Sequence, residues 1–569
     1  MTTIAELLLA RAADDATGLR FGDASWTWRQ VVEESAARAS WLEDLRLPGP
    51  FHIGVLLDNV PEYLFLLGGA ALAGATVVGI NPTRRGTELA GDIRHTDCQL
   101  LVTDTGHLPL IEGLDTGVER RRVVVIDEHE GTGHTDHAGH AGHAGHAGDV
   151  LDRGPGSNRP QPPGPEALYL LLFTSGSTGA PKAVRVSQGR LADAGLSMAT
   201  GSGFGAGDVL YGSMPMFHGN ALNLCIVPAI ASGACLVLRR RFSASGFLPD
   251  VRRYGATYFN YVGRALAYIL ATPAQTDDAD NTLRFGFGTD ASPSDMAAFK
   301  KRFGCPIIEG YGSSEGAISM SRVPGTPRQA IGMPPPGTEV AIVDPVTGTE
   351  CPPARLDGAG RLLNASDAIG EIVSRNGAGR FEGYYANEEA EAERTRGGWF
   401  WSGDLGYRDE DGFFYFAGRP ADWLRVDGEN FAAAPVERIL SRLPGVVTAA
   451  VYPVPDPQTG DQVMATLELR PGATFDPVAF VAFLAAQEDL GTKWAPRFVR
   501  IAPQMPLTGT NKVDKRPLRS VRWTTDDPVW WRPFGGRHDD GAYRLLTAAD
   551  TVDLRRQFES HGRTALLDY

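Results

Sequence analysis

The sequence predicts an α/β protein with a large N-terminal domain, residues 1–418, and a small C-terminal α+β domain, residues 419–569. The chain of 569 residues is longer than one hydrophobic core usually is, so more than one domain is expected. Apolar β-branched runs alternate with helical patterns through the first two-thirds, which is typical of layered, mostly parallel sheets and helices. A hairpin-like run ends near residue 418, and the pattern after it indicates a helix followed by a strand.

The apolar runs place individual elements of the N-terminal domain. We expect buried strands at HIGVLLDN (52–59), ATVVGIN (75–81), QLLVTD (99–104) and RRVVVID (121–127). The apolar spacing of residues 28–45 predicts a helix.

An uncharged stretch, residues 63–80, just reaches the length of a membrane span. We interpret it as a buried helix followed by a short strand. Pro61 and Glu62 suit the first turn of that helix, and Gly74 can end it. The sequence therefore predicts no transmembrane span.

A low-complexity insertion, about residues 129–165, interrupts the α/β pattern. It repeats histidine with a strict period of three, at His137, His140, His143 and His146. Such a tract can bind a metal ion, but its Gly and Ala neighbours cannot bury a core. We therefore expect a surface insertion that ends in a Pro/Gly linker.

Charge and cysteine content exclude several classes of protein. The net charge is −14, which argues against a nucleic acid or an anionic membrane as the main partner. The five cysteines are scattered and form no CxxC pair, so we expect neither a disulfide framework nor a thiolate zinc site. The N-terminus is a poor signal peptide, and a cytoplasmic location follows as the expectation.

Residues 174–179, TSGSTG, form a candidate phosphate-binding loop directly after an apolar run. Glycine lets the backbone approach a ligand closely, and hydroxyl and N–H groups suit phosphate oxygens. Lys182 adds a cation. The loop is not a Walker A motif, because Gly179 is followed by Ala-Pro-Lys. Taken alone, it could also be a flexible Ser/Gly turn.

Five more motifs follow this loop in order. They are YGSSEG (311–316), GE (370–371), SGDLGYRDEDG (402–412), GR-x-x-D (418–422) and PLTGTNKVDKRPLR (506–519). The set resembles the adenylate-forming superfamily of acyl-CoA synthetases, nonribosomal-peptide adenylation domains and luciferases, from about residue 5 to the end of the chain. Residues 238–273, the TGTNK sequence and the tail 543–563 most resemble the fatty-acid-transport-protein branch of very-long-chain acyl-CoA synthetases.

The resemblance implies an ATP-dependent acyl-CoA synthetase with two half-reactions. The carboxylate of a fatty acid or a similar apolar acid attacks the α-phosphate of ATP, which gives acyl-AMP and pyrophosphate. Coenzyme A then displaces AMP. Because the first step joins two anions, the site must neutralise charge and align the attack, so Mg²⁺ is implied together with ATP and coenzyme A.

Most of the ATP site is implied by position in the motifs. The phosphates would be held by Thr174, Ser175, Gly176, Ser177, Thr178, Gly179 and Lys182. Glu315 would bind Mg²⁺, because a hard cation prefers carboxylate oxygen. The nucleoside would contact Gly288, Thr289, Asp290, Gly310, Tyr311, Gly312, Ser313, Ser314, Asp404 and Arg419. Of these, Asp404 would accept hydrogen bonds from both ribose hydroxyls.

Lys512 resembles the mobile lysine that bridges the substrate carboxylate and the α-phosphate, and the implied catalytic residues are Lys512, Glu315 and Thr174. Lys515 is the rival lysine. Asp422 would be the hinge about which the C-terminal domain rotates between half-reactions, and Gly428 would line the coenzyme A tunnel.

The implied acyl pocket consists of His218, Tyr261, Val262 and Gly263. His218 resembles the gate beside the acyl carboxylate, although a histidine packed between its neighbours would fit the same sequence.

Two alternatives stay open. The first is a standalone adenylating enzyme for a bulky natural-product acid, for example in antibiotic biosynthesis, that loads coenzyme A or a carrier protein. The second, from another class, is a lipid-binding or transport protein. The sequence leaves open the identity of the acid, a carrier protein as partner, and a homodimer.

Overall fold

The computed structural model describes residues 2–126, 162–174, 182–263, 265–289, 291–358, 362–419, 423–426, 429–458, 460–487, 489–491, 493–509, 512–533 and 542–567. The His-rich tract and nearly all of the predicted insertion lie outside these ranges.

Two mostly parallel sheets form the centre of the N-terminal domain within this part of the chain. The larger has the order β14 (Ser319–Ser321), β13 (Ile307–Gly312), β12 (Phe285–Thr289), β11 (Tyr258–Val262), β9 (Val209–Gly212), β10 (Cys235–Leu238), β1 (Thr17–Phe21), β2 (Ala24–Thr27). The second has the order β6 (Val123–Ile126), β5 (Cys98–Asp104), β3 (His52–Leu56), β4 (Thr76–Gly79), β7 (Leu168–Thr174), β8 (Lys182–Ser187). In both, antiparallel pairing occurs at an edge. The α/β fold class and the four predicted strands are confirmed.

Helices cover these sheets and complete their cores. They are α1 (Ile4–Leu9), α2 (Trp28–Asp44), α3 (Pro61–Ala73), α4 (Gly86–His95), α6 (Gln188–Ser202), α7 (Gly219–Ala221), π-helix η3 (Leu222–Ile226), α8 (Val227–Ser232), α9 (Ala244–Tyr254), α10 (Ala265–Ala271) and α11 (Pro293–Phe303). Short 3₁₀ turns are η1 (Leu108–Leu110) and η2 (Arg120–Arg122).

Helix α3 resolves the question raised by the uncharged stretch. It starts with Pro61 and ends where Gly74 adopts a left-handed conformation with φ 68°. The chain then enters β4, as the sequence predicts, and most of the helix is buried among other elements. No helix of the described residues combines the length and apolar character that crossing a bilayer requires.

A third, antiparallel sheet joins the two halves of the protein. Its strands are β15 (Val340–Val343), β16 (Gly370–Ser374), β17 (Phe400–Arg408) and β18 (Phe414–Gly418), accompanied by α12 (Ala365–Ala368), α13 (Glu388–Arg394) and the 3₁₀ turn η4 (Arg396–Gly398). Strands β17 and β18 form the predicted hairpin.

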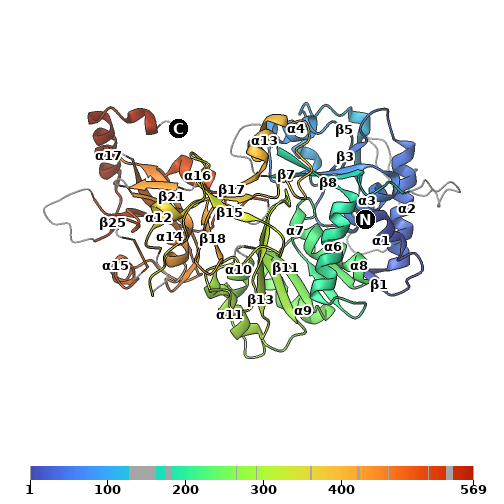
Figure 1. Ribbon diagram of the computed structural model, residues 1–569, viewed down its shortest axis with the longest axis horizontal. Coiled ribbons are helices and arrows are strands. Elements are labelled where there is room, and N and C mark those ends of the chain that lie inside the picture. The colour runs from blue at the N-terminus through green and yellow to red at the C-terminus, as the bar shows by residue number, and fades with distance from the viewer. Residues whose placement is uncertain are drawn as a thin grey trace.

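The C-terminal α+β domain has cores of its own. Its elements are β19 (Trp423–Val426), β20 (Glu429–Ala432), α14 (Ala433–Leu440), β21 (Val446–Pro455), β22 (Asp461–Leu469), α15 (Pro477–Ala485), β23 (Phe498–Ala502), α16 (Lys515–Val521), β24 (Val529–Trp531), β25 (Arg544–Leu545), α17 (Ala548–Ser560) and η6 (Thr564–Leu567). Figure 1 shows this orange-to-red domain at one end of the molecule, opposite the blue N-terminal elements.

The two domains touch at a few well-defined places. The Tyr268 hydroxyl of α10 donates a hydrogen bond of 3.3 Å to Glu468 of β22. Gly509 lies against Asn81, such that a Cβ atom at Gly509 would come within 2.4 Å of the Asn81 Oδ1 atom. This close approach places the segment between β23 and α16 on the N-terminal domain.

The packing of α3 against α2 yields a test of the core. A Cβ atom at Gly69 would lie 2.6 Å from the Arg38 Cβ and 2.9 Å from the Ala39 backbone nitrogen. We expect Gly69→Ala to lower the free energy of unfolding by about 1–3 kcal/mol, because the helices would be forced apart. Gly91→Ala in α4 is the matched control, since nothing lies within 4 Å of its added Cβ. Urea denaturation measures both, and equal stability of the two variants would contradict the packing.

Candidate active site

The candidate phosphate loop begins and ends at two strands that pair with each other. Thr174 is the last residue of β7, and it lies opposite Lys182, the first residue of β8. Residues 175–181 lie outside the described residues, so the roles of Ser175, Gly176, Ser177, Thr178 and Gly179 stay predictions. The strand pairing nevertheless brings the hydroxyl of Thr174 and the ammonium of Lys182 to the same end of the sheet.

Lys182 is buried, with only 7% of its side chain exposed. Its Nζ atom lies 3.7 Å from the Glu393 carboxylate of α13 and 6.0 Å from the centre of the Tyr384 ring. The ion pair and the aromatic face both attract the ammonium group and hold it at this place.

Glu315 follows β13 in the YGSSEG motif and is also buried. Its Oε1 atom accepts a hydrogen bond of 2.8 Å from the Tyr384 hydroxyl. Burial raises the pKa of Tyr384, and the neighbouring Glu315 carboxylate raises it further, so the tyrosine remains a hydrogen-bond donor. Tyr384 thus contacts both of the predicted phosphate-site charges, Lys182 through its ring and Glu315 through its hydroxyl.

The donor set around Glu315 fits Mg²⁺. Among the described residues no cluster of three or more His, Cys, Asp and Glu side chains could hold a metal ion. Magnesium does not need one, because it usually binds one or two carboxylates together with water and substrate phosphate oxygens. Glu315 is a buried carboxylate that could supply the protein's share of such a shell.

Asp404 of β17 and Tyr311 of β13, two of the residues predicted to contact the nucleoside, lie side by side. The Tyr311 hydroxyl donates a hydrogen bond of 2.8 Å to Asp404 Oδ2, and Arg419 Nε donates one of 3.0 Å to Oδ1. Burial and the Asp404 carboxylate raise the pKa of Tyr311 well above its ordinary value. A carboxylate has about four acceptor positions, so Asp404 can still accept from two ribose hydroxyls.

Glycines allow the strands beneath the predicted base site to pack closely. A Cβ atom at Gly288 of β12 would lie 2.3 Å from the Tyr261 carbonyl oxygen of β11. Thr289 ends β12, and its carbonyl accepts a hydrogen bond of 2.7 Å from the Gly263 amide. Gly310 and Gly312 belong to the neighbouring strand β13, with Ser313 and Ser314 just beyond it. Asp290 lies outside the described residues.

His218, a predicted acyl-pocket residue, lies within electrostatic reach of charges from both domains. It precedes α7, and its buried Nδ1 atom has no hydrogen-bond partner within the described part of the chain. Burial lowers the pKa of His218 to about 4, and the ammonium of Lys512 adds to the decrease while Glu315 opposes it. The imidazole is therefore neutral at physiological pH, between a cation of the C-terminal domain and a carboxylate of the N-terminal domain.

Lys512 is distinguished from its rival by position. Lys512 is exposed. Its backbone carbonyl accepts a hydrogen bond of 2.7 Å from the Thr508 amide. Lys515 instead pairs with Glu437 at 2.9 Å inside the C-terminal domain. The electrostatic effect on His218 comes from Lys512, so Lys512 is the better candidate for the predicted adenylation lysine.

The other predicted acyl residues adjoin His218. Asn220 donates a hydrogen bond of 3.2 Å to the Tyr261 carbonyl and accepts one of 2.7 Å from Asn260. Tyr261 and Val262 are buried, and Gly263 follows them with a positive φ of 44°. The segment 218–220 and the end of β11 therefore form one connected wall.

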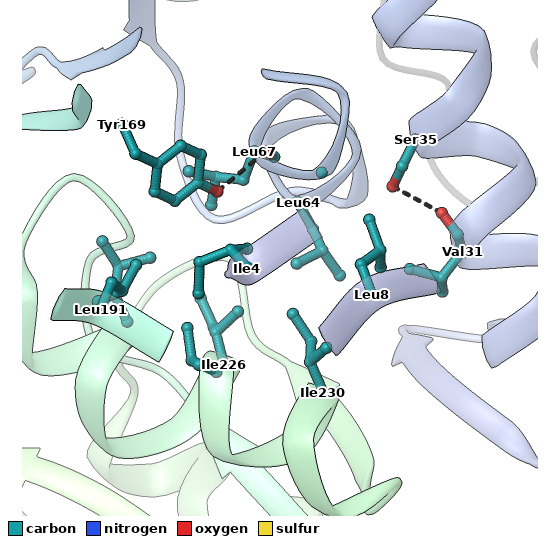
Figure 2. A pocket seen from close by; sticks show the side chains of 13 residues that line it. Ile4, Leu8, Val31, Ser35, Leu64, Leu67, Tyr169, Leu191, Ile226 and Ile230 are labelled. Carbon is teal, nitrogen blue, oxygen red and sulfur yellow. Dashed lines mark hydrogen bonds between the residues drawn. The ribbon is translucent and has the colours of Figure 1, made fainter. Parts of the chain in front are cut away.

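A separate apolar cavity lies behind the π-helix η3 (Figure 2). Ile4 and Leu8 point into it from α1, Leu64 from α3 and Ile226 from η3. The Ser35 hydroxyl at its edge donates to the Val31 carbonyl rather than facing a ligand. Its volume of about 20 Å³ is far below the roughly 300–1,000 Å³ of a typical ligand pocket. The acyl group therefore needs another place.

Several contacts of the site were not predicted from the sequence. Glu309 accepts hydrogen bonds from the Tyr261 hydroxyl and the Ala291 amide, at 3.0 and 2.6 Å. Glu371, the acid of the GE motif, accepts one of 2.6 Å from the Gly403 amide and so shapes the turn before Asp404. Three further residues lie between the GE motif and the SGDLGYRDEDG motif: Tyr384, Glu393 and Arg394. The sequence there is rich in aromatic and charged residues, which is the only signal it offers for them. The predicted hinge Asp422 and tunnel residue Gly428 lie outside the described residues.

The pKa of His218 predicts a change in stability with pH. The folded protein holds the imidazole neutral down to about pH 4, whereas the unfolded chain takes up a proton near pH 6.5. Stability is therefore lost as the pH falls from about 6.5 toward 4, by about 2 kcal/mol at pH 5. We expect His218→Gln to lack this part of the loss in urea titrations at pH 7.5 and 5. An identical loss in the variant and the parent would contradict the assignment.

Comparison with known proteins identifies the family. The AMP-binding enzyme family matches residues 9–385, and the AMP-binding enzyme C-terminal domain matches residues 435–512. The chain is 53% identical to a steroid-22-oyl-CoA synthetase of Rhodococcus jostii, over all of this chain and 99% of that protein. It is 44% identical to a medium/long-chain-fatty-acid–CoA ligase of Mycobacterium tuberculosis, over 93% of this chain and 98% of that protein.

Solved structures of CoA ligases and related enzymes share the fold of this chain. The structure of an anthranilate CoA ligase in complex with anthranoyl-AMP matches with a TM-score of 0.75 at 24% identity, over 91% of this chain and 97% of that one. ATP-bound MatB from Rhodopseudomonas palustris matches with a TM-score of 0.76 at 23% identity, over 91% and 99%. The large N-terminal and small C-terminal domains are thus those of adenylate-forming enzymes. The chain belongs to the AMP-binding enzyme family and is an AMP-forming acyl-CoA ligase that uses ATP, Mg²⁺ and coenzyme A.

Proposed function

We propose that this ligase activates a steroid acid that carries its carboxylate on the side chain, and transfers the resulting acyl group to coenzyme A. The observation that carries the proposal is the 53% identity with a steroid-22-oyl-CoA synthetase, which extends over the whole of this chain. The fatty acid expected from the sequence is the second candidate, because the 44% identical relative is a medium/long-chain-fatty-acid–CoA ligase.

The chemistry of the acyl site is compatible with a bulky apolar acid. His218 is neutral and Tyr261 and Val262 are buried, so these three side chains add no charge of their own to the wall of the predicted acyl pocket. A four-ring steroid acid, like a fatty acid, would place its carboxylate beside Lys512 and its hydrocarbon part farther from that charge. A steroid acid and a fatty acid would therefore be distinguished by the shape of the apolar part of the acyl pocket.

We also assign roles to the residues of the predicted ATP site. Lys182 and Thr174 would hold the β- and γ-phosphates, and Glu315 would supply the carboxylate oxygen for Mg²⁺. Tyr311 would flank the adenine, and Asp404, supported by Arg419, would bind the ribose. These assignments rest on the two connected sets of contacts, Lys182–Tyr384–Glu315 and Tyr311–Asp404–Arg419.

Lys512 would act in the first half-reaction only. It lies close enough to depress the pKa of His218, which suits a cation that bridges the acid's carboxylate and the α-phosphate. For the second half-reaction the C-terminal domain would rotate about Asp422, so that Gly428 lines the path of coenzyme A. The contacts of Tyr268 with Glu468 and of Gly509 with Asn81 would then separate.

We place the enzyme in the cytoplasm, where the other substrates of acyl activation are found. The cysteines Cys98, Cys225, Cys235, Cys305 and Cys351 are all unpaired, which supports a reducing compartment.

An acid panel tests the substrate class. We expect kcat/KM for a steroid with a C22 carboxylate to exceed that for straight-chain medium- and long-chain fatty acids by at least about tenfold, because a rigid apolar bed discriminates by shape. Acyl-CoA is measured by mass spectrometry with ATP, Mg²⁺ and coenzyme A present. Equal or better turnover of a fatty acid would replace the steroid acid with the second candidate, and acyl-AMP without acyl-CoA would indicate a carrier-protein acceptor.

The role of Lys512 is tested by separating the half-reactions. We expect Lys512→Ala to slow acyl-AMP formation by about 10²–10³, since it removes one positioned charge-stabilising group. Thioester formation from supplied acyl-AMP should keep its rate. Lys515→Ala is the matched control and should retain adenylation, because Lys515 pairs with Glu437 away from the site. Equal loss in both half-reactions of Lys512→Ala would contradict the assignment.

A further inference from the structure

The charge that faces Lys182 in the structure comes from outside the known motifs. Glu393 lies on α13, and its Oε2 atom is 3.7 Å from the Lys182 Nζ atom. The two partners differ greatly in exposure, since 58% of the Glu393 side chain and 7% of the Lys182 side chain are accessible. The pair therefore joins a buried cation to an acid that borders water.

A buried ammonium needs a partner. Removing it from water is costly unless an opposite charge or a polar group compensates. The Tyr384 ring provides a weak attraction from 6.0 Å, but the Tyr384 hydroxyl is already used by Glu315. Glu393 supplies the full negative charge that the structure shows beside Lys182.

The same ammonium cannot face Glu393 and a triphosphate equally well. Phosphate oxygens at Lys182 would bring further negative charge next to the Glu393 carboxylate, and like charges at this distance repel each other. Lys182 is enclosed and must stay, whereas Glu393 can turn into water at little cost.

Helix α13 itself is held in place by its neighbours. The Glu391 carboxylate accepts a hydrogen bond of 3.2 Å from the Tyr384 amide, and Arg394 Nη1 donates one of 3.2 Å to the Trp401 carbonyl. Glu391 lies two residues before Glu393, and Arg394 lies one residue after it. Displacement of Glu393 is therefore a change of its side chain and does not require the helix to move.

We propose that Glu393 is a positioning residue that neutralises Lys182 in the nucleotide-free enzyme and is displaced when the β- and γ-phosphates bind. The proposal rests on the phosphate role assigned to Lys182 and is independent of the acid substrate. Glu393 sets a limit on nucleotide affinity, because it competes with the phosphates for the same cation.

The test compares Glu393→Gln with Glu389→Gln, an exposed acid of the same helix. We expect Glu393→Gln to lower the dissociation constant for Mg²⁺-pyrophosphate, measured by calorimetry without any acid, by about threefold to fivefold, the effect of removing one partly exposed ion pair. The KM for ATP should fall by the same factor, while the single-turnover rate of acyl-AMP formation at saturating ATP stays unchanged. Glu389→Gln should match the parent enzyme in all three measurements.

The Lys182→Met background separates competition from a merely structural role. There Glu393→Gln should have no further effect on pyrophosphate affinity, because the contested cation is gone. Unchanged or weaker pyrophosphate binding in Glu393→Gln alone would overturn the proposal, and so would the same gain in the Lys182→Met background. Pyrophosphate binding that survives Lys182→Met unaltered would overturn the phosphate role of Lys182 as well, whatever acid the enzyme uses.

Discussion

The active site depends on the close approach of the C-terminal domain to the N-terminal domain at Gly509. A side chain at this position would have to displace that of Asn81, because a Cβ atom would come within 2.4 Å of Asn81 Oδ1. Asn81 is itself fixed, since its Oδ1 accepts hydrogen bonds of 2.9 Å from the amide and hydroxyl of Thr83. Lys512 follows three residues after Gly509, so this contact sets where its ammonium can reach. In this arrangement Lys512 and Glu315 both act electrostatically on His218, although the three residues come from distant parts of the chain.

Charge balance unites the remaining features of the site. A ligase that joins a carboxylate to a polyphosphate needs cations, yet buried cations need partners before the substrates arrive. The structure meets this need at Lys182 with the acid Glu393, whereas in the pair of Asp404 with Arg419 the acid is buried and the cation is exposed. Tyr384 connects the phosphate-site charges because its ring lies near Lys182 and its hydroxyl binds Glu315. When a substrate binds at such a site, one set of ionic partners replaces another. The buried charges are therefore never left without a partner in the protein interior.

The sequence allowed the α/β fold, the buried helix of residues 61–73 and the hairpin before residue 418 to be predicted, because periodicity and turn residues act locally. The motif residues Glu315 and Asp404 were also predicted, since their residue type suits the chemistry. Their partners could not be, because Tyr384 and Tyr311 reach them only through the folded arrangement of separate sheets. Pairing across domains is likewise invisible in the sequence: nothing in it indicates that Gly509 meets Asn81. The roles of all the predicted site residues, including the loop 175–179, Asp290, Asp422 and Gly428, stay predictions.

The most direct test of this account is a disulfide between Asn81→Cys and Gly509→Cys, which would hold the domains in the arrangement seen here. The oxidised enzyme should form acyl-AMP and pyrophosphate from ATP and its acid at close to the parent rate. It should form no acyl-CoA until a reductant opens the bond, because coenzyme A transfer would require the contact to separate. An oxidised enzyme that makes acyl-CoA at the parent rate would show that one arrangement serves both half-reactions and would contradict the account.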